Sequence, residues 1–143
     1  MPILPVAPTR ILLADDHASF RAVLKEMLEK EPDIQVIGEV GDGIELLESL
    51  SSNIFHAIPD VIILDVQMRR MGGMEAAKRV TQIEPAIRLL ALSMHDDAQF
   101  VLAMIAAGVS GYILKDDPWP TLLGAIRSVA AGKPCFSPAL NYR

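Results

Sequence analysis

Short apolar runs alternate along the chain with longer segments in which apolar residues recur every three or four positions. Most runs are continuous, as in strands that are buried on both faces of a parallel sheet, and one alternates. The runs predict strands at 11–14, 34–40, 61–64, 88–92 and 111–114. The segments between and after them predict helices at about 20–28, 44–50, 73–83, 97–107 and 119–131.

Prolines and glycines mark the ends of these helices. Pro32 and Pro85 stop the first and third, and Gly108 and Gly132 follow the fourth and fifth. Strands that alternate with helices predict right-handed crossovers and a parallel sheet covered on both faces. We therefore expect an α/β fold: a flavodoxin-like, doubly wound sheet of five parallel strands in the order 2-1-3-4-5, with five helices.

Polar residues stand directly after four of the apolar runs. They are the pair Asp15 and Asp16, then Asp65, Ser93 and Lys115. Ligands and reactive groups of a parallel sheet gather at the carboxyl ends of its strands, so these residues are expected to share one site. Three carboxylates, a hydroxyl and an ammonium are the groups needed to hold Mg²⁺ and a phosphoryl group.

Composition limits the other function classes. With 51% hydrophobic and 22% charged residues, the chain is globular and not disordered. A net charge of −5 and scattered Lys and Arg argue against a nucleic-acid surface. A single cysteine excludes an internal disulfide and fits a reducing cytosol, and no apolar run approaches the ~20 residues of a membrane span.

A length of 143 residues fits one domain. Residues 1–9 are proline-rich and have no signal-peptide pattern, and we expect them to form a flexible leader. Residues 10–132 form the predicted domain, and residues 133–143 a C-terminal tail or the start of a linker.

Four motifs together resemble the receiver domain of two-component response regulators, over roughly residues 9–132. Their order and spacing are specific, although each motif is common alone: LLADDH at 12–17, PDVIILDVQM at 59–68, ALS at 91–93 and GYILKD at 111–116. The longer stretch AGVSGYILKD at 107–116, with AG at 131–132 and FSP at 136–138, looks most like the NarL/LuxR-type branch. Members of that branch usually carry a C-terminal helix-turn-helix DNA-binding domain.

The resemblance implies that Asp65 accepts a phosphoryl group from a sensor histidine kinase. A carboxylate can act as a nucleophile toward phosphorus, and the transfer then depends on positioning and on charge neutralisation. The resemblance also implies Mg²⁺ held by the side chains of Asp16 and Asp65 and the backbone carbonyl of Gln67, with Asp15 acting through water. Without a cation, these clustered carboxylates would repel one another, and at least one pKa would rise.

The same resemblance assigns roles around the phosphoryl group. Ser93 would hydrogen-bond it and Lys115 would pair with it. Tyr112 stands where the family has an aromatic residue that rotates as Ser93 moves. Gln67 and His95 occupy positions that flank the phosphoryl group in receivers, and we expect them to tune its lifetime.

One position departs from the family pattern. Receivers usually have a proline four residues after the acceptor, and this chain has Arg69. Because proline fixes its own φ and lacks an N–H, its loss should loosen the following loop. Arg69 also adds a cation near the site, which would attract phosphate or weaken Mg²⁺ binding, or be benign. His17 is expected at the helix start near the pocket, and we do not assign it as a ligand.

Each site residue also has an ordinary structural interpretation. The Asp15-Asp16 pair would suit the cap of the first helix, and Ser93 the cap of the fourth. Asp65 would be a loop residue at a strand end, Lys115 a solvated lysine, and Tyr112 a packing residue. Their joint placement favours the site.

The predicted function is a phosphorylation-activated switch rather than an enzyme with a separate substrate. Its output would be a changed surface around the fourth helix, fifth strand and fifth helix, acting on an effector domain or on a second copy as a dimer. The expected setting is cytoplasmic, without membrane or direct nucleic-acid contact. A stand-alone or phosphorylation-independent receiver that acts as a protein-interaction module is the alternative. A haloacid-dehalogenase-type phosphatase is disfavoured because Gln67 replaces its second Asp, and a flavodoxin because the first loop is acidic.

Overall fold

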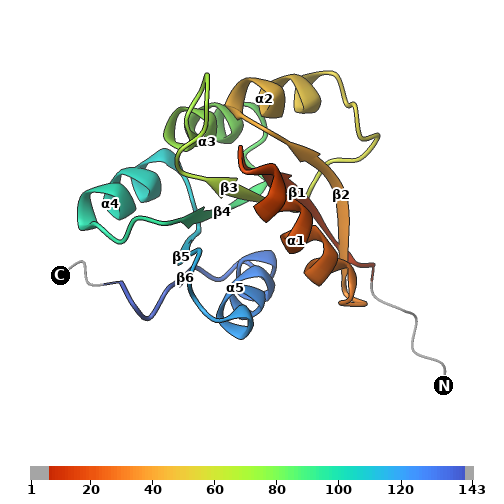
Figure 1. Ribbon diagram of the computed structural model, residues 1–143. Coiled ribbons are helices and arrows are strands. Elements are labelled where there is room, and N and C mark those ends of the chain that lie inside the picture. Colours follow the sequence, from red (N-terminus) through yellow and green to blue (C-terminus); the bar gives the residue numbers. More distant parts are fainter. Residues whose placement is uncertain (1–6, 141–143) are drawn as a thin grey trace.

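A six-stranded parallel sheet forms the centre of the computed structural model, which describes residues 7–140 (Figure 1). The strand order is β2-β1-β3-β4-β5-β6, so the predicted order 2-1-3-4-5 is confirmed and a sixth strand is added. The strands are β1 (Thr9–Ala14), β2 (Ile34–Val40), β3 (Val61–Asp65), β4 (Arg88–Ser93), β5 (Gly111–Leu114) and β6 (Cys135–Phe136).

Five helices cover the two faces of the sheet, as predicted. They are α1 (Ala18–Glu29), α2 (Gly43–Ser51), α3 (Gly73–Ile83), α4 (Ala98–Ala107) and α5 (Trp119–Ala130). Successive strand residues point to opposite faces, and this divides the core into two clusters. Leu12, Ile62 and Ala91 pack with α2, α3 and α4 on one face, whereas Ile11, Ile63 and Leu90 pack with α1 and α5 on the other.

The sixth strand corrects the prediction of five. Cys135 and Phe136, in the predicted tail, pair with Gly111 and Tyr112 of β5. The Ser137 N–H then donates to the Tyr112 carbonyl at 2.9 Å. The strand has only two residues, which is too short for an apolar pattern to show in the sequence.

The chain ends of the domain differ from the expected boundaries. Thr9, in the predicted leader, begins β1, and its N–H donates to the Asp33 carbonyl at 2.9 Å. Residues 1–6 of that leader lie outside the described residues. Within residues 7–140, none of the helices combines the length and apolar character that a membrane span needs.

The strand register brings the predicted site together. β1 lies between β2 and β3, and Ala14 pairs with Leu64. Asp15, directly after β1, and Asp65, the last residue of β3, therefore lie side by side. The Asp15 N–H donates to the Val40 carbonyl of β2 at 3.1 Å, which fixes the backbone at this edge.

Candidate functional site

An acidic cluster occupies the carboxyl edge of the sheet, where the sequence predicts the site. Asp15 and Asp65 are each only 5% exposed, and Asp16 is partly buried beside them. Lys115, from the end of β5, reaches this cluster, and its Nζ lies 2.8 Å from Asp15 Oδ2 and 3.3 Å from Asp65 Oδ2. The structure thus brings together four of the residues that the sequence singled out.

Lys115 is part of the site and not a solvated loop lysine. Its side chain is 7% exposed, and its Nζ lies 4.6 Å from the centre of the Phe20 ring. An ammonium above an aromatic face is stabilised by the ring, so Phe20 supports the buried cation as well as packing in the core. The alternative of a surface lysine is wrong.

His17 also lies at the carboxylates, although sequence reasoning did not assign it to the site. It is the N-cap of α1, as its expected place at the helix start implies, and its N–H donates to Asp15 Oδ1 at 2.8 Å. Its Nδ1 lies 3.3 Å from both Asp15 Oδ1 and Asp16 Oδ1 and 3.9 Å from Asp65 Oδ2. The one sequence signal for this was its place directly after Asp16.

Burial and repulsion disturb the ionisation of Asp65. Burial, and after it the negative charge of Asp15, raise its pKa to about 6, although Lys115 and the Gln67 N–H act in the opposite direction. The predicted effect of crowding the carboxylates is therefore present despite Lys115. This site favours an additional cation whenever Asp65 is ionised.

The donor set fits a divalent metal ion. One ligand atom from each of Asp15, Asp16, His17 and Asp65 lies within 4.8 Å of the others. Asp16 Oδ1 is buried and makes no hydrogen bond within residues 7–140, although His17 Nδ1 lies 3.3 Å from it. Buried polar atoms without a partner are rare, and a cation would satisfy this one. The residues present can hold a metal.

Ser93, His95 and Tyr112 form a connected set beside the cluster. The His95 N–H donates to Ser93 Oγ at 2.9 Å, and the Tyr112 hydroxyl donates to the His95 carbonyl at 2.7 Å. The His95 ring stacks on Phe100 of α4, with ring centres 4.8 Å apart. Ser93 is the last residue of β4, and Asp97 is the N-cap of α4, so the interpretation of Ser93 as a helix cap is wrong.

The loop after β3, residues 66–72, carries the other predicted residues. The Gln67 N–H donates to Asp65 Oδ1 at 3.3 Å. Arg69 is 81% exposed, and its Nε lies 3.8 Å from Asp16 Oδ2, so the extra cation stands at the rim of the cluster. Arg70, which the sequence did not single out, binds Asp42 at the start of α2.

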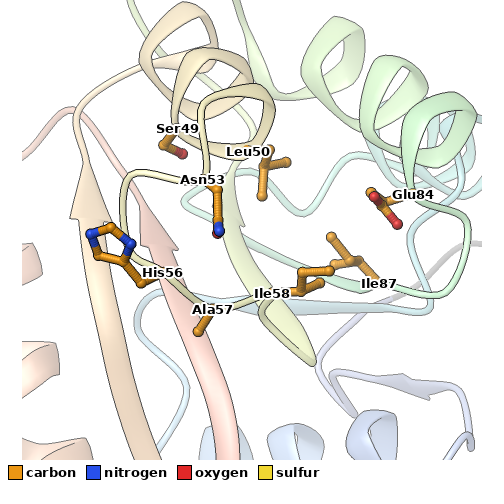
Figure 2. Close-up of a pocket in the computed structure, with 8 residues that line it drawn as sticks. All are labelled: Ser49, Leu50, Asn53, His56, Ala57, Ile58, Glu84 and Ile87. Carbon is orange, nitrogen blue, oxygen red and sulfur yellow. The ribbon is translucent and has the colours of Figure 1, made fainter.

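A separate cavity lies at the opposite edge of the sheet (Figure 2). Its volume is about 320 Å³, and residues that precede β3 and β4, including Ile58 and Ile87, line it. Asn53 and His56 on its wall have positive φ angles of 49° and 54°. The cavity shares no residue with the acidic cluster.

Comparisons with known proteins agree with this geometry. The family model of the response regulator receiver domain matches residues 11–127. The chain is 36% identical over 137 residues to the nitrate/nitrite response regulator protein NarL of Escherichia coli (strain K12), covering 94% of this chain and 60% of that protein. It is 34% identical over 136 residues to the transcriptional regulatory protein DegU of Brevibacillus brevis, covering 93% of this chain and 55% of DegU. The chain therefore spans little more than half the length of these two relatives.

A solved structure gives the same result. The crystal structure of a LuxR-family two-component response regulator from Aurantimonas sp. SI85-9A1 superposes with a TM-score of 0.85 at 31% identity, covering 92% of this chain and 91% of that one. The order of the strands, the acidic cluster and the comparisons all indicate the same family. The chain belongs to the response regulator receiver domain family and is a receiver of the NarL/LuxR type.

Proposed function

We propose that this receiver is switched by phosphorylation of Asp65, with a sensor histidine kinase as the donor and Mg²⁺ as the cofactor. The observation that carries the proposal is the buried carboxylate of Asp65, with Lys115 Nζ 3.3 Å away and two further carboxylates beside it. A carboxylate of this kind can attack phosphorus, and the cations around it offset the charge of the incoming phosphoryl group.

Mg²⁺ would be held by the side chains of Asp16 and Asp65 and by the backbone carbonyl of Gln67, with Asp15 acting through water. Mg²⁺ binds one or two carboxylates together with waters and phosphate oxygens, and when bound it neutralises negative charge. The buried Asp16 Oδ1, which makes no hydrogen bond to the described residues, and the raised pKa of Asp65 both support a cation here.

The chain's own residues would drive the switch. Phosphorylation turns the single charge of Asp65 into about two and adds strong acceptor oxygens. Lys115 Nζ, already shared with Asp15, would pair with these oxygens. The Ser93 hydroxyl, which now accepts from the His95 N–H, would turn and donate to the phosphoryl group. Contacts made only in the phosphorylated state are what shift a two-state equilibrium.

The change would pass to the surface through His95 and Tyr112. The Tyr112 hydroxyl donates a hydrogen bond to the His95 carbonyl, and the His95 ring stacks on Phe100 of α4. Because His95 contacts Ser93, movement of Ser93 would act on both β5 and α4. The face formed by α4, β5 and α5 would then change its contacts with an effector domain or a second copy. Shifting the two states from 1:99 to 99:1 takes about 5.5 kcal/mol of differential binding.

The lifetime of the phosphoryl group would depend on Gln67 and His95. Gln67 is exposed next to the acceptor, and the His95 backbone contacts Ser93. We expect Gln67→Ala and His95→Ala to change the dephosphorylation rate of the labelled protein. Unchanged rates in both variants would remove these residues from the proposal.

The partners and the cellular compartment are proposed from the family. The relatives NarL and DegU are named a response regulator and a transcriptional regulatory protein. We propose a cytoplasmic role in transcription regulation, with DNA contact made by an effector domain rather than by this receiver, whose net charge is −5. The receiver would also catalyse its own phosphorylation and dephosphorylation.

A phosphorylation-independent interaction module is the second candidate. The observation that favours it is Arg69, whose guanidinium lies 3.8 Å from Asp16 and would compete with a metal ion.

Intact-mass measurement after incubation with acetyl phosphate separates the two. We expect one Mg²⁺-dependent phosphoryl group in the wild type, labile to hydroxylamine and missing in Asp65→Asn. No label in the wild type, but label in Arg69→Pro, would show that Arg69 disables the site. If neither the wild type nor Arg69→Pro takes up a phosphoryl group, from acetyl phosphate or from histidine kinases, the interaction module is favoured.

A further inference from the structure

A second ion pair ties the loop after Asp65 to the start of α2. Asp42 is 9% exposed, and its carboxylate accepts from Arg70 Nε at 2.8 Å and from Arg70 Nη2 at 3.1 Å. Such two-point contacts of a guanidinium with a carboxylate fix direction as well as distance. The Arg70 side chain holds the pKa of Asp42 below its ordinary value, so the pair stays charged at neutral pH.

The backbone at Arg70 needs this support. Its φ of 62° lies in the left-handed region that favours glycine, and the Met71 N–H donates to the Arg69 carbonyl at 2.6 Å, which closes a tight three-residue turn. A strained turn of this kind persists only where the surroundings hold it. The turn sends Arg70 toward α2 and Arg69 toward the acidic cluster.

The backbones of the two segments also meet. The Gly43 N–H donates to the Met71 carbonyl at 3.2 Å, and a Cβ on Gly43 would stand 2.7 Å from that oxygen, so only glycine permits the approach. At the base of the loop, the Gly73 N–H donates to the Val66 carbonyl at 2.8 Å. The loop is thus fixed at its base and at its tip, and Gln67 and Arg69 lie between these points.

We propose that Asp42 and Arg70 are positioning residues for the phosphoryl-accepting site. The pair fixes the loop so that the Gln67 carbonyl can face the metal site. It supplies the restraint that is lost because position 69 is not a proline. This inference rests on the proposed function, since it concerns the same loop and metal site, but neither residue belongs to the acidic cluster.

Asp42 also has a structural role as the N-cap of α2, and a test variant must retain this cap. Its Oδ1 accepts from the Glu45 N–H at 2.9 Å and so caps α2. Asparagine caps helices about as well as aspartate. Asp42→Asn therefore retains the cap and removes the charged pair, while Arg70→Gln removes the pair from the other side and retains a polar side chain at the same backbone angle.

The two variants also change the net charge in opposite directions. If the pair acted only through space, losing the Asp42 charge would weaken Mg²⁺ binding and losing the Arg70 charge would strengthen it. If the pair positions the loop, both variants weaken Mg²⁺ binding. Groups that orient metal ligands affect affinity by about 10- to 100-fold, and we expect a roughly tenfold rise in the Mg²⁺ dissociation constant in each variant.

The experiment compares wild type, the two single variants and the double variant. Calorimetric titration gives Mg²⁺ affinity, acetyl phosphate gives the initial labelling rate, and hydrogen exchange reports on the amides of residues 66–72. We expect weaker Mg²⁺ binding, slower labelling and faster exchange in both single variants. The double variant should match either single one, because the contact can be lost only once.

Three results would overturn the inference: Mg²⁺ affinities that shift in opposite directions, affinities that equal the wild type, or additive losses in the double variant. Its failure is distinguishable from failure of the proposed function. If the wild type takes no label from acetyl phosphate or from histidine kinases, the proposed function fails, and Mg²⁺ affinity with hydrogen exchange still decides whether the pair fixes the loop. Urea unfolding of each variant checks that the comparison is made on folded protein.

Discussion

Replacing Asp65 by asparagine should stabilise the metal-free protein at neutral pH. In the folded chain, burial and the nearby Asp15 raise the pKa of Asp65 from 3.8 to about 6, even with Lys115 beside it. That rise is equivalent to about 3 kcal/mol, at about 1.36 kcal/mol per unit of pKa. Water at the open side of the cluster screens part of this cost, and we expect a gain of about 1–2 kcal/mol in the variant.

The shifted pKa of Asp65 makes the free energy of unfolding of the wild type depend on pH. The carboxyl of Asp65 loses its proton near pH 3.8 when the chain is unfolded and near pH 6 when it is folded. The unfolded state binds fewer protons between these values, so the wild type loses stability as the pH rises from 3.8 to about 6. The gain of Asp65→Asn is therefore close to zero below pH 3.8, grows across this interval and is constant at higher pH.

Urea unfolding in EDTA, at several pH values from 4 to 8, measures this gain. Glu26→Gln is the matched control, because it also replaces a carboxylate by an amide, on the exposed side of α1. Saturating Mg²⁺ should reduce the gain, since it stabilises the ionised wild-type site. A gain that does not vary with pH, or a variant less stable than the wild type at pH 8, would refute the electrostatic account of Asp65.

Three further substitutions test other contacts. Gly73→Ala should lower the free energy of unfolding by about 1–3 kcal/mol, because the new Cβ would lie 2.3 Å from the Asp65 carbonyl oxygen; a more stable variant, as helix propensity alone predicts, would contradict this. Tyr112→Phe should cost about 1 kcal/mol in urea unfolding through its lost bond to the His95 carbonyl, and an unchanged midpoint would contradict that bond. Lys115→Met should raise the pKa of Asp65 above about 6, which carboxyl NMR measures, and a lower value would show that Lys115 does not stabilise the ionised form.

The buried parts of the fold were accessible from sequence. Four predicted strands are continuous apolar runs because both faces of the sheet are covered, and their ends match the observed ends within about two residues. Because reactive groups gather at the carboxyl ends of parallel strands, the sequence predicted that Asp15, Asp65 and Lys115 lie together. The distances from Lys115 Nζ to the two carboxylates confirm this prediction.

Contacts between segments that are distant in the chain could not be predicted from the sequence. Asp42 and Arg70 are 28 residues apart, and neither interrupts an apolar pattern, so nothing local marks them as partners. β6 is held by backbone bonds to β5 rather than by an apolar run of its own. The sequence reasoning also predicted a looser loop at Arg69, whereas the structure supplies new restraints from α2 through Arg70.

The identity of the acceptor is the claim on which the account depends. Borohydride reduces an aspartyl phosphate to homoserine, so treating the acetyl phosphate-labelled protein and sequencing its peptides by mass spectrometry locates the modified residue. The account predicts homoserine at position 65, only when Mg²⁺ was present during labelling. Homoserine at position 15 or 16, or none in protein whose intact mass shows the label, would contradict it.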